Sequence, residues 1–125
     1  MKVRRNDVDG VGVIYLEEST DIEFGNCDEF GEAVAGLLRA DDRNMVLDGS
    51  RIDFFDSAGM GSLLSLQKRL EKQGGHFVLA ALNRSVEEVF NMVGFDVLFS
   101  IFRDVTGAVN SFRTTDQDDQ KGNPA

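Results

Sequence analysis

The chain has 125 residues, one domain's length, and its 13 Lys and Arg against 22 Asp and Glu give a formal net charge of −9. Phosphate backbones and anionic lipids repel such an acidic chain, which argues against nucleic acid or membrane surfaces as partners. The single cysteine, Cys27, excludes an internal disulfide framework, and one cysteine with one histidine leaves too few soft ligands for zinc. Because we find no signal-peptide pattern and no apolar run near the ~20 residues that span a bilayer, we expect a cytoplasmic protein without membrane insertion.

The first third of the chain predicts a hairpin followed by a helix. Residues 2–5 and 11–16 are candidate strands, joined by the turn signal Asp9-Gly10, and residues 17–21 form a polar loop. The helix begins at Asn26, with Glu29 completing a capping box and Cys27 as a small buried residue in its first turn. Helical spacing predicts an apolar face of Phe30, Ala33, Val34, Leu37 and Leu38. Asp41 and Asp42 are expected to end the helix.

The rest of the chain alternates strands and helices. Apolar runs predict strands at residues 45–47, 76–82 and 97–102, and residues 52–55 lead as a strand end into a helix. Helical spacing predicts three further helices, whose apolar residues are first Met60, Leu63, Leu64, Leu66 and Leu70, then Val86, Val89, Phe90 and Val93, and last Val105, Ala108, Val109 and Phe112. Their expected start signals are Asp56, the capping box of Ser85 and Glu88, and Asp104.

This alternation predicts an α/β fold with a mixed, mostly parallel sheet of four to five strands and about four helices, covered more on one face than the other. We expect residues 1–113 to form the domain. Residues 114–125 have no large apolar side chain and predict an acidic, flexible C-terminal tail.

Enzymatic chemistry has little support in the sequence. The chain has neither a Gly-x-Gly-x-x-Gly helix start nor a Gly-Lys-Ser/Thr phosphate loop, so no cofactor is predicted. The one histidine, His76, heads a strand, where an exposed or hydrogen-bonded role is the simpler interpretation. Asp48, Asp53 and Asp56 could imitate a magnesium cluster, but two of them stand where turns and helix caps favour aspartate, so no metal site is predicted.

The junction at residues 54–61 is the most informative segment. A strand end runs directly into a helix whose first turns contain Gly59 and Gly61. Free N–H groups at such a start accept a carboxylate cap or a phosphate carried on a serine. Two interpretations stay open: Asp56 or Ser57 only caps the helix while the glycines permit close packing, or the junction is a functional site.

Residues 45–64 resemble the central signature of STAS domains, the sulfate-transporter and anti-sigma-factor-antagonist fold. The resemblance continues through residues 68–79 and 85–99; it is tight over residues 45–102 and extends over about residues 1–113. It implies a binding module and not an enzyme. Free-standing members bind an anti-sigma factor that is also a serine kinase, and so release a sigma factor.

In this family the kinase phosphorylates a Ser or Thr at the helix start, usually immediately before the glycine. That position is Ala58 here, so the candidate acceptor is Ser57, one residue earlier. The resemblance places the partner-binding surface on Asp56, Ser57, Ala58, Gly59 and Met60. Two alternatives remain: an accessory STAS subunit of an ABC-type membrane transport complex, and a module that senses a nucleotide or another small ligand.

Overall fold

The computed structural model describes the backbone of residues 1–121 and the side chains of residues 1–113. It opens with the antiparallel hairpin of β1 (Val3–Val8) and β2 (Val11–Leu16), as predicted. The turn residues Asp9 and Gly10 have φ angles of 52° and 81°. Two positive φ angles are what a tight hairpin turn between right-twisted strands requires, so the Asp-Gly pair sets the register.

A five-stranded sheet forms the centre of the molecule. The parallel strands β4 (Asn44–Asp48), β6 (His76–Ala80) and β7 (Ile101–Phe102) extend the hairpin, in the order β1-β2-β4-β6-β7. Adjacent positions on neighbouring strands align Val13, Val46 and Val78 on one face, and Ile14, Leu47 and Leu79 on the other. Both faces are apolar because both are covered, which is the usual state of parallel strands. The predicted mixed, mostly parallel sheet is confirmed.

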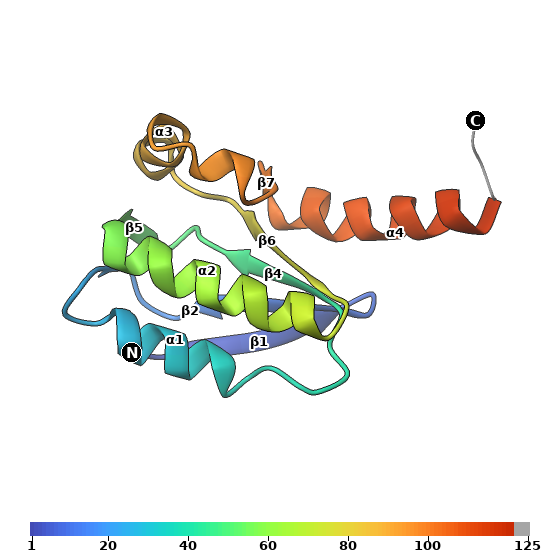
Figure 1. Ribbon diagram of the computed structural model, residues 1–125, viewed down its shortest axis with the longest axis horizontal. Coiled ribbons are helices and arrows are strands. Elements are labelled where there is room, and N and C mark those ends of the chain that lie inside the picture. Colours follow the sequence, from blue (N-terminus) through green and yellow to red (C-terminus); the bar gives the residue numbers. More distant parts are fainter. Residues whose placement is uncertain (122–125) are drawn as a thin grey trace.

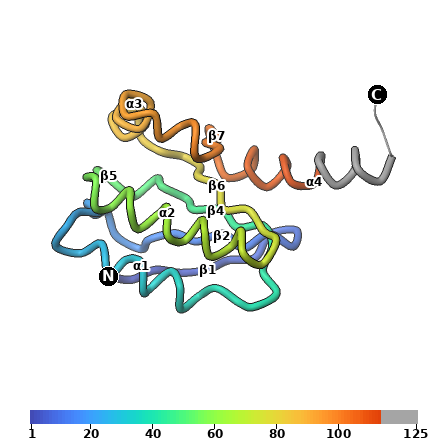
Figure 2. Tube along the Cα trace, in the orientation of Figure 1, coloured from blue at the N-terminus to red at the C-terminus, as the bar shows by residue number. Residues whose placement is uncertain are grey.

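Helices cover the two faces unequally (Figure 1). The helices α1 (Cys27–Ala35), α2 (Ser57–Lys72) and α3 (Arg84–Met92) contribute Phe30, Leu63, Leu70 and Phe90 to the larger core, with Ile14 and Leu47. The fourth helix, α4 (Val105–Lys121), packs Ala108 and Val109 against the valine face. The tube in Figure 2 shows the same arrangement, with α1 beside α2. The four predicted helices and the unequal cover are confirmed.

A second, two-stranded sheet lies beside the helix junction. β3 (Thr20–Ile22) pairs in parallel with β5 (Ile52–Phe55). The prediction of a polar loop over residues 17–21 is wrong at Thr20 and Asp21, which belong to β3. Ile22 is fully buried and fixes this strand, an effect that the surrounding polar residues conceal in the sequence.

The start and the end of α1 differ from prediction. Asn26 stands at the N-cap position but makes no side-chain cap; its Oδ1 accepts a hydrogen bond from Glu23 N–H at 2.8 Å instead. The predicted capping box is therefore wrong, because the asparagine closes the preceding turn. The helix ends at Ala35, so Asp41 and Asp42 do not close it. Cys27 is buried in the first turn, as predicted.

Two further differences lie after β6. Asn83, and not the box of Ser85 and Glu88, caps α3, since its Oδ1 accepts from Val86 N–H at 2.8 Å. The helix ends at Met92, which leaves Val93 59% exposed, and Val89 is only half-buried.

The strand predicted at residues 97–102 is wrong for its first four positions. The chain forms a 3-10 helix at Phe95–Val97, and only Ile101 and Phe102 join the sheet. Burial of Phe95 and Phe99 in the core takes precedence over strand propensity here. Asp104 caps α4 through Gly107 N–H at 2.7 Å, as predicted. The tail predicted at residues 114–125 falls outside the residues whose side chains the structure describes.

Candidate functional site

Asp56 connects two segments at the junction between β5 and α2. Its Oδ1 accepts a hydrogen bond from Gly59 N–H at 2.8 Å and so caps the helix. Its Oδ2 accepts from Phe24 N–H at 2.9 Å, across 32 positions of sequence. A single carboxylate therefore joins the start of α2 to the loop that precedes α1.

These bonds also set the charge of Asp56. The Gly59 N–H, followed by the Phe24 N–H, lowers the pKa of the Asp56 carboxyl, while loss of solvent opposes them. The group is consequently ionised at neutral pH. A fixed negative charge occupies the positive end of α2, where such a charge is favourable.

Gly59 lets α2 approach β3 very closely. A Cβ at this position would lie 2.4 Å from the carbonyl oxygen of Ile22, a distance that no side chain tolerates. Gly61 differs, because nothing lies within 4 Å of a Cβ placed there. The close-packing interpretation is therefore right for Gly59 and wrong for Gly61, which is exposed.

The other candidate residues are divided between surface and interior. Ser57 is exposed at the first position of α2, and Ala58 is half-buried against the core. Gly59 is buried, and Met60 is 8% exposed with its side chain in the core. Among the predicted contact residues, Ser57 offers the most accessible side chain.

The loop before α1 and strand β5 each add one aromatic residue to this surface. Phe24 is 84% exposed, and Phe54, on β5, is 45% exposed. Periodicity in such short segments does not assign either residue to the core or to the surface. Hydrogen bonds fix the loop: Asn26 accepts from Glu23 N–H and donates to the Asp21 carbonyl at 2.8 Å. An ordered turn thus exposes Phe24 to solvent. In the sequence, its position between Glu23 and Gly25 was the signal that could have predicted this exposure.

The other candidate chemistry does not assemble. Within residues 1–113, no group of three His, Cys, Asp or Glu side chains is placed to hold a metal ion. Asp48 accepts from Ser50 N–H at 2.9 Å and stabilises a turn, while His76 is exposed at the start of β6. In the described part of the chain, no helix has the length and apolar character needed to cross a membrane.

Comparison with known proteins identifies the fold. A family model described as the STAS domain matches residues 3–108. This chain belongs to the STAS domain family. The match covers the sheet, α1 to α3, the α2 junction and the start of α4, so the resemblance seen in the sequence is confirmed.

One curated relative aligns with nearly the whole STAS domain. The protein BtrV of Bordetella bronchiseptica, described as a candidate anti-sigma factor antagonist, is 29% identical over 114 residues. The alignment covers 91% of this chain and 97% of the relative. The alignment therefore spans nearly the whole of both sequences.

Solved structures share the fold at lower identity. A candidate anti-sigma factor antagonist from Thermotoga maritima has a TM-score of 0.78 and 21% identity over 89% of this chain and 94% of its own. An anti-sigma factor antagonist from Mycobacterium paratuberculosis has a TM-score of 0.77 and 22% identity, covering 90% and 93%. The murine Slc26a9 anion transporter also matches, at 0.75 and 20%, covering 87% of this chain and 18% of the transporter. At identities this low, the similarity shows a shared fold alone.

Proposed function

We propose that this STAS domain is an anti-sigma factor antagonist of the cytoplasm, a binding protein and not an enzyme. It binds an anti-sigma factor that is also a serine kinase, and the anti-sigma factor then releases its sigma factor. The relative of near-equal length and the free-standing structural neighbours, which carry this description, support the assignment. The observation that carries the docking site is the carboxylate of Asp56, which holds Phe24 and the start of α2 together.

The docking surface is Phe24, Phe54, Asp56, Ser57 and Ala58, here named the α2 entry surface. Its two aromatic rings are exposed, and an exposed aromatic pair beside polar groups is typical of the energetic centre of an interface. The loop and the helix start are already ordered by Asp56, so binding requires little further ordering. Gly59 and Met60 support this surface from below.

Phosphorylation of Ser57 is the proposed switch. The Ser57 hydroxyl oxygen attacks the γ-phosphorus of ATP, its proton is lost, and ADP leaves. The product places a charge of about −1.5 to −2 on the first residue of α2. The Gly59 N–H already donates to Asp56, so the phosphate lies beside a carboxylate at a helix start that is already capped.

The consequence is repulsion in two directions. The phosphate opposes any partner surface arranged for a neutral hydroxyl, and it weakens the Asp56 bond that orders Phe24. Binding is therefore lost while the core, which lies under Gly59 and Met60, is unaffected. Ala58 has no hydroxyl and is half-buried, so Ser57 is the accessible acceptor at this helix start.

An affinity capture from the native cytoplasm tests the assignment. We expect wild-type protein to retain an anti-sigma factor with a kinase domain. Phe24→Ala should reduce the retained amount by about tenfold, as for a central aromatic contact. Tyr15→Ala, which truncates an exposed ring on β2, is the matched control and should retain the wild-type amount.

A transport complex is the second candidate, favoured by the fold shared with the anion transporter. Retention of an ABC transporter ATPase in place of an anti-sigma factor would contradict the first assignment and support this one. If neither protein is retained but a nucleotide is, the module is a small-ligand sensor.

A further inference from the structure

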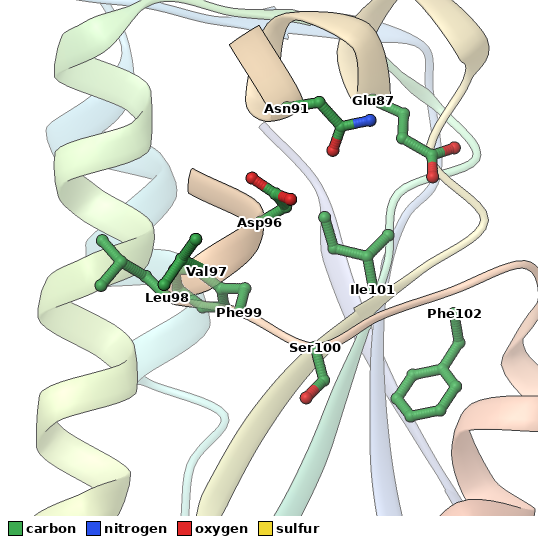
Figure 3. Close-up of a pocket in the computed structure, with 9 residues that line it drawn as sticks. All are labelled: Glu87, Asn91, Asp96, Val97, Leu98, Phe99, Ser100, Ile101 and Phe102. Atoms are coloured by element: carbon green, nitrogen blue, oxygen red, sulfur yellow. The ribbon is translucent and has the colours of Figure 1, made fainter. Parts of the chain in front are cut away.

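A cavity of about 500 Å³ opens at the outer edge of β7. Ile101 and Phe102 of β7 are among the residues that line it. Figure 3 shows Glu87 and Asn91, from α3, and Asp96, from the 3-10 helix, around Ile101. The cavity shares no residue with the α2 entry surface. Val97 and Leu98 also line the cavity, which we name the β7 edge groove.

The main chain of β7 is open on the groove side. β7 is the last strand of the sheet, and within residues 1–121 it pairs only with β6. Leu79 N–H donates to the Ser100 carbonyl at 3.0 Å, and Ala81 N–H donates to the Phe102 carbonyl at 3.1 Å. Since main-chain groups alternate along a strand, the N–H and C=O of Ile101 point away from β6. An edge with this polarity can pair with one more strand.

Apolar side chains stand beside the open edge. Val97 is 84% exposed and Leu98 50% exposed. Their exposure is fixed by the fold, because the flanking Phe95 and Phe99 are buried with ring centroids 5.1 Å apart. Gln67 of α2 also donates from its amide to the Leu98 carbonyl at 2.6 Å. Val97 and Leu98 are therefore exposed apolar side chains on an ordered segment. Such a pair indicates a binding surface more strongly than apolar residues on a frayed segment would.

The charge of the groove selects the occupant. Both ionisable residues among those that line it, Glu87 and Asp96, are acidic and exposed. Arg103 follows the strand but does not line the cavity. The chain's own residues 114–125 contain three Asp and one Lys, so like charge disfavours them here. The complementary segment is cationic.

We propose that the β7 edge groove binds an extended segment of a partner protein in which apolar side chains alternate with Lys or Arg. The segment pairs its main chain with Ile101. Every second side chain packs on Val97 and Leu98, and the intervening cations face Glu87 and Asp96. This site provides a second contact that is independent of the α2 entry surface.

Peptide titration followed by amide NMR tests the proposal. The probe is the acetylated and amidated heptapeptide Lys-Val-Lys-Val-Arg-Ile-Lys, and its charge-inverted counterpart is Glu-Val-Glu-Val-Glu-Ile-Glu. We expect saturable shifts centred on Ile101 with the basic peptide, and hydrogen exchange of the Ile101 amide slowed by about tenfold or more. The acidic peptide should bind at least about tenfold more weakly.

Two double variants separate the groove from general charge. Glu87→Lys with Asp96→Lys should weaken binding of the basic peptide by about tenfold or more. Glu32→Lys with Glu71→Lys changes the same number of exposed carboxylates outside the groove and should leave affinity within about twofold.

Equal weakening by both double variants, or no saturable binding, would overturn the proposal. So would binding that leaves Ile101 exchange unchanged, because that places the peptide elsewhere. A concentration-dependent dimer that Glu87→Lys with Asp96→Lys abolishes would assign the edge to a second copy of the chain instead. None of these results bears on capture through Phe24.

Discussion

Arg5 on β1 and Asp42 in the loop after α1 form a doubly hydrogen-bonded ion pair. The Nη1–Oδ2 and Nη2–Oδ1 distances are 2.8 and 2.7 Å, and the side chains are 9% and 8% exposed. Arg39 N–H donates to the same carboxylate at 2.6 Å, and the Leu37 carbonyl accepts from Arg5 at 2.8 Å. The pair therefore attaches the loop between α1 and β4 to the hairpin.

Removing Arg5 should be far more costly than removing its neighbour Arg4. Arg5→Ala leaves the ionised Asp42 in the interior without its cation, although the Arg39 N–H still donates to it. We expect a loss of about 3–5 kcal/mol in the free energy of unfolding. Arg4 pairs with Glu17 but is 60% exposed, so Arg4→Ala should cost about 0–1 kcal/mol. Urea unfolding of both variants measures the difference. Similar losses would show that the Arg5 pair adds nothing to the fold.

The same pair predicts loss of stability in acid. Arg5 hydrogen bonds, and after them the Arg39 N–H, lower the pKa of Asp42 below its ordinary value. A lowered pKa in the folded state stabilises the protein above the unfolded value of about 4, and this contribution is lost as the pH falls through the lower folded value. We expect wild-type stability to decline below about pH 4, and Asp42→Asn to decline less over the same range. Parallel curves for the two proteins would exclude Asp42 as a source of the decline.

Gly59 and Gly61 should respond oppositely to alanine. A Cβ at residue 59 meets the Ile22 carbonyl at 2.4 Å, so α2 must shift away from β3, at a cost of about 1–3 kcal/mol. Gly61→Ala fills open space within a helix and should stabilise by about 0.5–1 kcal/mol. Thermal unfolding of the two variants checks the signs. A tolerated Gly59→Ala would contradict the close approach at the site.

Leu70 is a core position on α2 whose truncation should visibly lower stability. It is fully buried among the residues that join α2 to the sheet. Leu70→Ala should cost about 2–5 kcal/mol through lost burial and the cavity left behind. Lys72→Ala, on the exposed side of the same helix, should change stability by less than about 0.5 kcal/mol. An unchanged denaturant midpoint for Leu70→Ala would show that the helix face is misassigned.

Short-range patterns predicted the scaffold of this domain well. Apolar runs and turn residues located β2, β4 and β6, and Asp9-Gly10 located the hairpin, because these signals are contained within a few residues. Asp56 was recognised at a helix start for the same reason. Its second role was not, since the bond to Phe24 joins residues 32 positions apart.

Long-range contacts account for the failures. Asp41 and Asp42 follow an apolar stripe and resemble a polar helix end, yet Asp42 is buried because Arg5, 37 positions earlier, pairs with it. Phe95 and Phe99 replace most of an expected strand because ring contacts with the core determine that segment. No periodicity in the sequence carries this information.

Charge at Ser57 should control binding with little effect on folding. Ser57→Asp places a carboxylate beside the ionised Asp56 and should weaken binding to the captured anti-sigma factor by about tenfold or more. Its melting temperature should fall only slightly, because Ser57 is exposed and Asp56 retains the Gly59 N–H. Ser65→Asp, at another exposed position of α2, is the matched control and should bind as wild type does.

Direct phosphorylation completes this test. Incubation with the captured kinase and ATP, followed by mass spectrometry, should place phosphate on Ser57 and release the complex. Ser57→Ala should bind, remain unmodified and stay in the complex, because truncation to a methyl group removes the acceptor without adding charge. If wild-type protein binds but carries no phosphate on Ser57, the proposed switch is wrong, and the α2 entry surface docks its partner without this control.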